Sequence, residues 1–261
     1  HITTVSPNYA EEIQTESLGF GLQGLLAGRR QHITGILNGI STSEWDPATD
    51  PHLAKNYTNK KLSDKAVNKS TLQQQMGLAV DADIPLFGIV SRLNHQKGTD
   101  LLIQVAPQIT KIPAQLVILG SDHAELEHQL TALTQTYPHE IAVRIGFSEA
   151  LSHLIEAGAD CFLMPSRFEP CGLNQMYSQR YGTPPIVHAT GGLLDTVVDG
   201  TPITLANGSA SGFVFYPMTA ENLLNTIKRA ATAYHHKKNW QRLQKNCMAK
   251  DFSWHTSAAA Y

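Results

Sequence analysis

Short apolar runs alternate with amphipathic segments of helical length from residue 86 onward. The apolar runs show no internal polar alternation, which is typical of parallel strands buried on both faces. The segments between them are long enough to form helices that cover such a sheet. The pattern therefore predicts an α/β fold with a parallel sheet flanked by helices. The predicted strands are 86–90, 115–119, 141–145, 161–164 and 185–188, with helices near 99–110, 123–136, 149–157 and 172–179.

The two ends of the chain lack this alternation. Residues 1–40 hold a β-prone piece at 2–5, a helix near 9–14 and a glycine-rich loop. Residues 44–63 contain two prolines and several Asn and Lys residues, which predict an exposed connection. Two further helices are expected near 220–234 and 238–249, and a last helix begins after residue 252.

The segment that follows the strand at 161–164 is the leading candidate for an active site. It places Ser166, Arg167 and Glu169 in a loop, and Gly172 and Leu173 at the start of the next helix. Open α/β sheets bind their ligands at the carboxyl ends of their strands. Free amides at a helix start, with the positive end of the helix dipole behind them, suit a phosphate group.

A second loop, after the strand at 86–90, carries Arg92 and Lys97 just before a helix. Two cations in this position are suited to a diphosphate. Taken alone, they could equally be solvated surface charges. Because parallel strands all point one way, this loop and the Glu169 loop should emerge at the same edge of the sheet. Their pairing favours a binding site.

Two other features leave alternatives open. Cys171 lies inside the Glu169 loop, but a cysteine nucleophile needs a base and no histidine is close in sequence. A small packing residue beside the ligand is the favoured interpretation. The Gly191-Gly192 pair either lets the backbone approach a ligand closely or forms an ordinary turn.

Composition excludes several classes of function. The 20 basic and 22 acidic residues give a net charge near zero, which argues against a nucleic-acid groove. No apolar segment approaches the roughly 20 residues that cross a bilayer, so no membrane span is expected. The three cysteines have no paired metal spacing, which favours reduced thiols in the cytoplasm. Carboxylates with metal-ligand spacing are not apparent, so neither a metal nor another cofactor is expected.

Several motifs resemble those of bacterial glycogen synthases and plant starch synthases. They occur in the family's order along nearly the whole chain. The matching segments are SRFEPCGL at 166–173 with YGTP at 181–184, TVSPNYAEEI at 4–13, GILNGI at 35–40, SRL at 91–93 with QKG at 96–98, TGGL at 190–193 and FSW at 252–254.

The resemblance implies a retaining glucosyltransferase with the two-domain GT-B fold. Such enzymes transfer glucose from ADP-glucose to the non-reducing end of an α-1,4-glucan. Residues 38–251 would form the C-terminal, Rossmann-like domain that binds the donor, and 1–37 a remnant of the N-terminal domain. Residues 252–261 would begin a helix that crosses back to the N-terminal domain. The chain opens without a Met, so the rest of that domain is expected to be missing.

The resemblance also implies roles for individual residues. Arg92 and Lys97 match the pair that grips the donor diphosphate, and Glu169 matches an acidic residue that holds glucosyl hydroxyls and supports positive charge at the anomeric carbon. Gly172 and Leu173 would donate backbone hydrogen bonds to phosphate, with Cys171 beside them. Two further donor-binding residues are Phe147, where the family often has a Tyr near the adenine, and Asn38 at the interdomain hinge.

Some features depart from the family pattern. Asn174 stands in place of a common Thr, and His188 in place of a common basic residue. The N-terminal lysine and glycine-rich loop of the family are absent, so the chain alone is expected to bind ADP weakly and to lack transferase activity. A GT-B enzyme that uses a UDP-sugar remains an alternative, as does a non-catalytic nucleotide- or glucan-binding module. A sugar phosphorylase is disfavoured, because no segment resembles a pyridoxal-phosphate lysine site.

Overall fold

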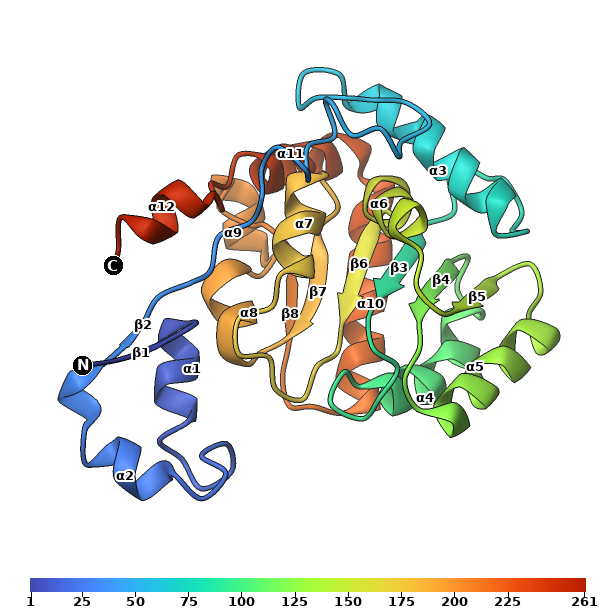
Figure 1. Ribbon diagram of the computed structural model, residues 1–261. Coiled ribbons are helices and arrows are strands. Elements are labelled where there is room, and N and C mark those ends of the chain that lie inside the picture. Colours follow the sequence, from blue (N-terminus) through green and yellow to red (C-terminus); the bar gives the residue numbers. More distant parts are fainter.

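A computed structural model describes residues 1–261 and contains a six-stranded parallel sheet at its centre (Figure 1). Its strand order is β5-β4-β3-β6-β7-β8. A separate pair, β1-β2, is also parallel and lies near the N-terminus. The strands are β1 (Ile2–Thr4), β2 (Ile33–Gly35), β3 (Leu86–Val90), β4 (Gln115–Gly120), β5 (Ile141–Ile145), β6 (Cys161–Met164), β7 (Pro185–His188) and β8 (Phe213–Phe215).

Helices cover both faces of this sheet (Figure 1). Side chains that alternate along the strands enter two separate apolar clusters. The larger cluster packs one face against α4, α5, α10 and α11, and the smaller packs the other face against α3, α6 and α8. The helices are α1 (Pro7–Glu12), α2 (Gln23–Ala27), α3 (Lys65–Gln75), α4 (Thr99–Ile109), α5 (Ala124–Thr136), α6 (Glu149–Gly158), α7 (Asn174–Arg180), α8 (Gly191–Thr196), α9 (Pro202–Asn207), α10 (Ala220–His235), α11 (Lys237–Met248) and α12 (Trp254–Ala258).

All five strands predicted from the apolar runs are confirmed as β3 to β7, and the helices between them as α4 to α7. The Rossmann-like fold class is confirmed with them. The structure adds β2, β8 and the helices α2, α3, α8 and α9, none of which the sequence pattern predicted. Strand β8 has only three residues, too few to show a period, and it completes the edge of the sheet beside β7.

The prediction of an exposed connection over residues 44–63 is wrong at Asp50 and Tyr57, which are 1% and 2% exposed. The Tyr57 hydroxyl donates a hydrogen bond of 2.7 Å to the Tyr181 carbonyl. Asp50 Oδ2 accepts hydrogen bonds from the Tyr181 hydroxyl at 2.5 Å and from His153 Nδ1 at 2.7 Å. The segment is polar because it forms a buried hydrogen-bond network, which composition alone does not distinguish from a solvated loop.

The residues at the two ends of the chain lie together on one side of the sheet (Figure 1). The Ile40 amide donates to the Phe252 carbonyl at 2.8 Å, and Gly39 packs directly against the backbone of Trp254. None of the helices combines the length and the apolar composition that a membrane crossing requires.

A buried ion pair joins α3 to the start of β6. Lys69 Nζ lies 2.8 Å from Asp160 Oδ2, and both residues are less than a tenth exposed. The ammonium also donates to the carbonyl of Ile84 at 2.6 Å and to the hydroxyl of Tyr234 at 2.9 Å. Asp160 Oδ2 in turn accepts from the Leu86 amide at the start of β3. The pair therefore fixes α3 on the sheet.

Replacing Lys69 by Met should lower the free energy of unfolding by about 3–5 kcal/mol, because it leaves the buried Asp160 carboxylate without its partner. Urea denaturation measures the loss. The matched control is Lys238→Met, on the exposed surface of α11, which should change stability by less than about 0.5 kcal/mol. Equal stability of the two variants would show that the ion pair does not hold α3 in place.

Candidate active site

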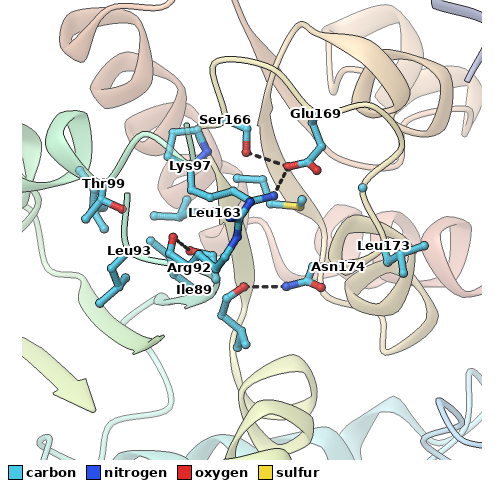
Figure 2. A pocket seen from close by; sticks show the side chains of 16 residues that line it. Ile89, Arg92, Leu93, Lys97, Thr99, Leu163, Ser166, Glu169, Leu173 and Asn174 are labelled. Atoms are coloured by element: carbon cyan, nitrogen blue, oxygen red, sulfur yellow. Dashed lines mark hydrogen bonds and ion pairs between the residues drawn. The ribbon is translucent and has the colours of Figure 1, made fainter. Parts of the chain in front are cut away.

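The two loops predicted to form a site meet at the carboxyl edge of the sheet. They follow β3 and β6, which are neighbouring strands. A cavity opens between them and the start of α7 (Figure 2). Of the site residues expected from the sequence, those that line the cavity are Arg92, Lys97, Glu169, Gly172 and Leu173.

The centre of the cavity is an ion pair between Lys97 and Glu169. Lys97 Nζ lies 2.5 Å from Glu169 Oε2, and the same oxygen accepts a hydrogen bond of 3.0 Å from the Ser166 hydroxyl. Figure 2 shows both groups converging on the carboxylate. The side chains of Lys97 and Glu169 are 19% and 9% exposed, so the pair is largely shielded but open to a ligand. Ser166 is almost fully buried and fixes the carboxylate's position.

Arg167 ties the two loops together. Its guanidinium donates two hydrogen bonds of 2.7 Å to the Asp100 carboxylate, and its backbone amide donates to the Gln96 carbonyl at 2.8 Å. The hydrogen bonds from Arg167 lower the pKa of Asp100, and the same bonds raise the pKa of Arg167. The guanidinium is therefore engaged within the protein, whereas Arg92 is exposed and makes one side-chain hydrogen bond, of 3.2 Å, to Gln96.

Gly98 allows the loops to approach each other. Its φ of +72° lies in the left-handed region, and a Cβ at this position would lie 1.9 Å from the Pro165 carbonyl oxygen. Only glycine combines that conformation with that space. Gly98 was not among the site residues predicted from the sequence, although it stands directly beside Lys97 and caps α4.

The Gly191-Gly192 pair, left open by the sequence, approaches the backbone of the Glu169 loop. A Cβ on Gly191 would lie 2.0 Å from the Glu169 carbonyl oxygen, and one on Gly192 would lie 2.1 Å from the Cys171 carbonyl oxygen. The Gly192 amide donates to the Glu169 carbonyl at 3.1 Å. The two glycines thus let their own backbone pack closely against the backbone of the Glu169 loop, which they support. Their lack of a side chain is required by this contact within the protein and not by a ligand.

The amides before α7 face the same cavity. The N–H groups of Gly172 and Leu173 make no backbone hydrogen bonds, and Gly172 has a φ of +68°. Asn174, expected only as a departure from the family pattern, also lines the cavity and donates to the Val90 carbonyl at 2.6 Å. With two cations, two amides that make no backbone hydrogen bonds and one carboxylate around it, the cavity can hold an anionic ligand that also carries hydroxyl groups.

Three expected site residues lie outside the cavity lining. Cys171 packs in a small apolar cluster with Ile40 and Met176, and burial raises the pKa of its thiol, which disfavours a nucleophilic thiolate. The Asn38 backbone lies beside that thiol and offsets part of the rise in its pKa. Phe147 is 85% exposed and follows the edge strand β5, two strands away from β3.

A family model described as glycosyl transferases group 1 matches residues 73–246. The chain belongs to the group 1 glycosyltransferases. A second model, the starch synthase catalytic domain, matches residues 1–28. The resemblance to glycogen and starch synthases predicted from the motifs is thereby confirmed, as is the assignment to the C-terminal half of a GT-B enzyme.

Individual relatives extend this family assignment over the whole chain. Glycogen synthases from Nitrosomonas eutropha and Nitrosospira multiformis are 67% and 61% identical over all 261 residues. The chain spans about half of their length, 52% in each case. Among solved structures, the catalytic domain of starch synthase IV from Arabidopsis thaliana, bound to ADP and acarbose, is 38% identical with a TM-score of 0.93. That match covers 99% of this chain and 54% of the other.

The approach of the two loops in this glycosyltransferase can be tested at Gly98. Gly98→Ala should destabilise the protein by about 1–2 kcal/mol for the left-handed conformation. The clash with Pro165 should add about 1–3 kcal/mol. Gly77→Ala is the matched control, since Gly77 has a φ of +74° and a Cβ added there would have nothing within 4 Å. Chemical denaturation of both variants separates the two contributions, and equal losses would contradict the close contact.

Proposed function

We propose that this chain is the donor-binding half of a glycogen synthase, which transfers glucose with retention from ADP-glucose to the non-reducing end of an α-1,4-glucan. The Lys97–Glu169 contact carries the proposal, because it places a cation and a carboxylate together in a cavity between two strand ends. The 67% identity to a glycogen synthase over the entire chain supports the choice of reaction.

In this proposal, Lys97 and Arg92 bind the diphosphate of the donor. The bond that breaks joins the anomeric carbon to the β-phosphate oxygen, so negative charge develops on the departing ADP. Cations fixed beside that oxygen stabilise the transition state more than the ground state. The amides of Gly172 and Leu173, which make no backbone hydrogen bonds, can donate to the same phosphates.

Glu169 acts on the sugar side of the bond that breaks, at the anomeric carbon. Glycosyl transfer passes through a transition state with positive charge at the anomeric carbon, which a nearby carboxylate stabilises. The carboxylate also accepts hydrogen bonds from glucosyl hydroxyls. Ser166 holds Glu169 Oε2 at 3.0 Å, which keeps the carboxylate in place when Lys97 turns toward phosphate.

The remaining assignments follow the resemblance. The exposed ring of Phe147 would stack on adenine, and Cys171 would pack beside the bound donor. Asn38 would lie at the hinge between residues 1–37, a remnant of the acceptor-side domain, and the donor domain at 38–251. Residues 252–261 would lead back to that other domain, which completes the cleft. The three cysteines are free and buried, which supports a cytoplasmic setting.

A calorimetric titration with ADP and, separately, with UDP tests the donor assignment. ADP should bind in preference to UDP, and Lys97→Ala should weaken ADP binding about tenfold, the value of one charge-assisted hydrogen bond. Lys238→Ala, on the exposed surface of α11, should bind ADP like the unmodified protein. A preference for UDP would instead indicate a related transferase with another donor.

Turnover tests the catalytic assignment separately. In the full-length protein, Lys97→Ala should lower kcat by about 100- to 1,000-fold, because a fixed charge beside the leaving group is lost. The variant should still fold, although less stably, because the buried Glu169 carboxylate keeps its hydrogen bond from Ser166 but loses Lys97, so urea denaturation must show that the protein is folded under the assay conditions. If the unmodified full-length protein binds ADP but transfers no glucose, the chain belongs to a binding module and not to an enzyme.

A further inference from the structure

A second cluster of polar side chains, away from the donor cavity, consists of His52, Glu149 and His153. Each offers one ligand atom, and these atoms all lie within 4.8 Å of one another. Glu149 and His153 are four residues apart on α6, and so share one face of that helix. His52 comes from the segment at 44–63, whose Asp50 and Trp45 contact His153 on that helix.

The surroundings of His153 leave one of its ring nitrogens, Nε2, available to bind a metal ion. The residue is 2% exposed, and its Nδ1 lies 2.7 Å from Asp50 Oδ2. Its other nitrogen, Nε2, is buried and has no hydrogen-bond partner. A buried polar atom without a partner is costly, so Nε2 points to an absent ligand. When Nδ1 carries the proton donated to Asp50, Nε2 presents a lone pair.

Asp50 and Trp45 hold the imidazole in place. Asp50 also accepts a hydrogen bond from the Tyr181 hydroxyl at 2.5 Å and one from the His52 amide at 2.8 Å. The Trp45 ring stacks on the His153 ring at 3.8 Å with an interplanar angle of 11°. A carboxylate behind a histidine is the usual arrangement at protein metal sites, where it fixes the ring and raises its basicity.

We propose that His52, Glu149 and His153 bind a divalent transition-metal ion, of which Zn²⁺ fits best. Two imidazoles and one carboxylate form a donor set that Zn²⁺ accepts, with water in the fourth position. The nitrogen ligands disfavour Mg²⁺ and Ca²⁺, which prefer oxygen. Ligand atoms around tetrahedral Zn²⁺ lie about 3.4 Å apart, given bonds of about 2.1 Å. The ligand atoms, which lie within 4.8 Å of one another, must therefore move closer together when the ion binds. The exposed Glu149 and the half-buried His52 can make this movement while His153 stays fixed.

The bound ion would fasten the segment at 44–63 to α6. Neither element contributes a side chain to the lining of the donor cavity. The site is therefore independent of the proposed transferase reaction, and its test does not depend on turnover.

Metal-stripped protein, purified without a histidine tag, should be titrated with ZnCl₂ by calorimetry. One ion should bind per chain, and the melting temperature should rise with the Zn²⁺ concentration, because the ion binds the folded state. Co²⁺ should give the intense visible absorption of a tetrahedral complex. MgCl₂ at the same concentration should produce neither the heat nor the shift.

Two surface variants locate the site. His52→Gln and Glu149→Gln should each weaken Zn²⁺ binding at least about tenfold and abolish the Co²⁺ bands. Both side chains are partly or fully exposed, so the variants should fold, and their melting temperatures without metal check this. His123→Gln is the control, since His123 is exposed and lies outside the cluster, and it should bind Zn²⁺ unchanged. Absence of saturable Zn²⁺ binding, or equal affinity in all three variants, would overturn the proposal.

Discussion

The candidate active site depends on the contact between the loops after β3 and β6. Three different constraints hold these loops together: the left-handed glycine at Gly98, the bidentate Arg167–Asp100 pair and the Lys97–Glu169 pair. The first two use no group that a donor would need. Lys97 and Glu169 are therefore held close by neighbours, and the energy of their own attraction is not required to form the cavity. A ligand phosphate can then compete for Lys97 without separating the loops.

The central sheet was predictable because its inner strands are buried on both faces, which leaves uninterrupted apolar runs such as 116–119. The convergence of Lys97 and Glu169 was predictable for a related reason, since parallel strands direct both loops to one edge. Strand β8 and helix α3 lacked such a signal. Helix α3 buries Lys65, Asn68, Lys69 and Gln73 along with Leu72, so its inward face reads as polar.

Buried polar contacts between distant segments account for most of what the sequence did not predict. Asp50, His153 and Tyr181 lie far apart in sequence and form one hydrogen-bonded group. The spacing of these residues along the chain does not predict that they meet. The proline and asparagine residues around Asp50 instead suggested a solvated loop. Metal ligands are subject to the same limitation. No metal was expected because no single segment contains residues with metal-ligand spacing, and such spacing does not reveal ligands that come from distant segments. The cluster of His52 with Glu149 and His153 exists only once the segment at 44–63 folds onto α6.

The first helix contacts the candidate site through a short series of hydrogen bonds. Glu12 Oε1 accepts from the Gly191 amide at 2.8 Å and from the Thr190 hydroxyl at 2.9 Å. The next amide, that of Gly192, donates to the carbonyl of Glu169. Glu12 lies within residues 1–28, the part that matches the starch synthase catalytic-domain model. Residues 190–192 thus connect the Glu12 side chain on α1 to the backbone carbonyl of Glu169. The first segment therefore supports the loop that carries Glu169 from behind, although none of its own side chains lines the cavity.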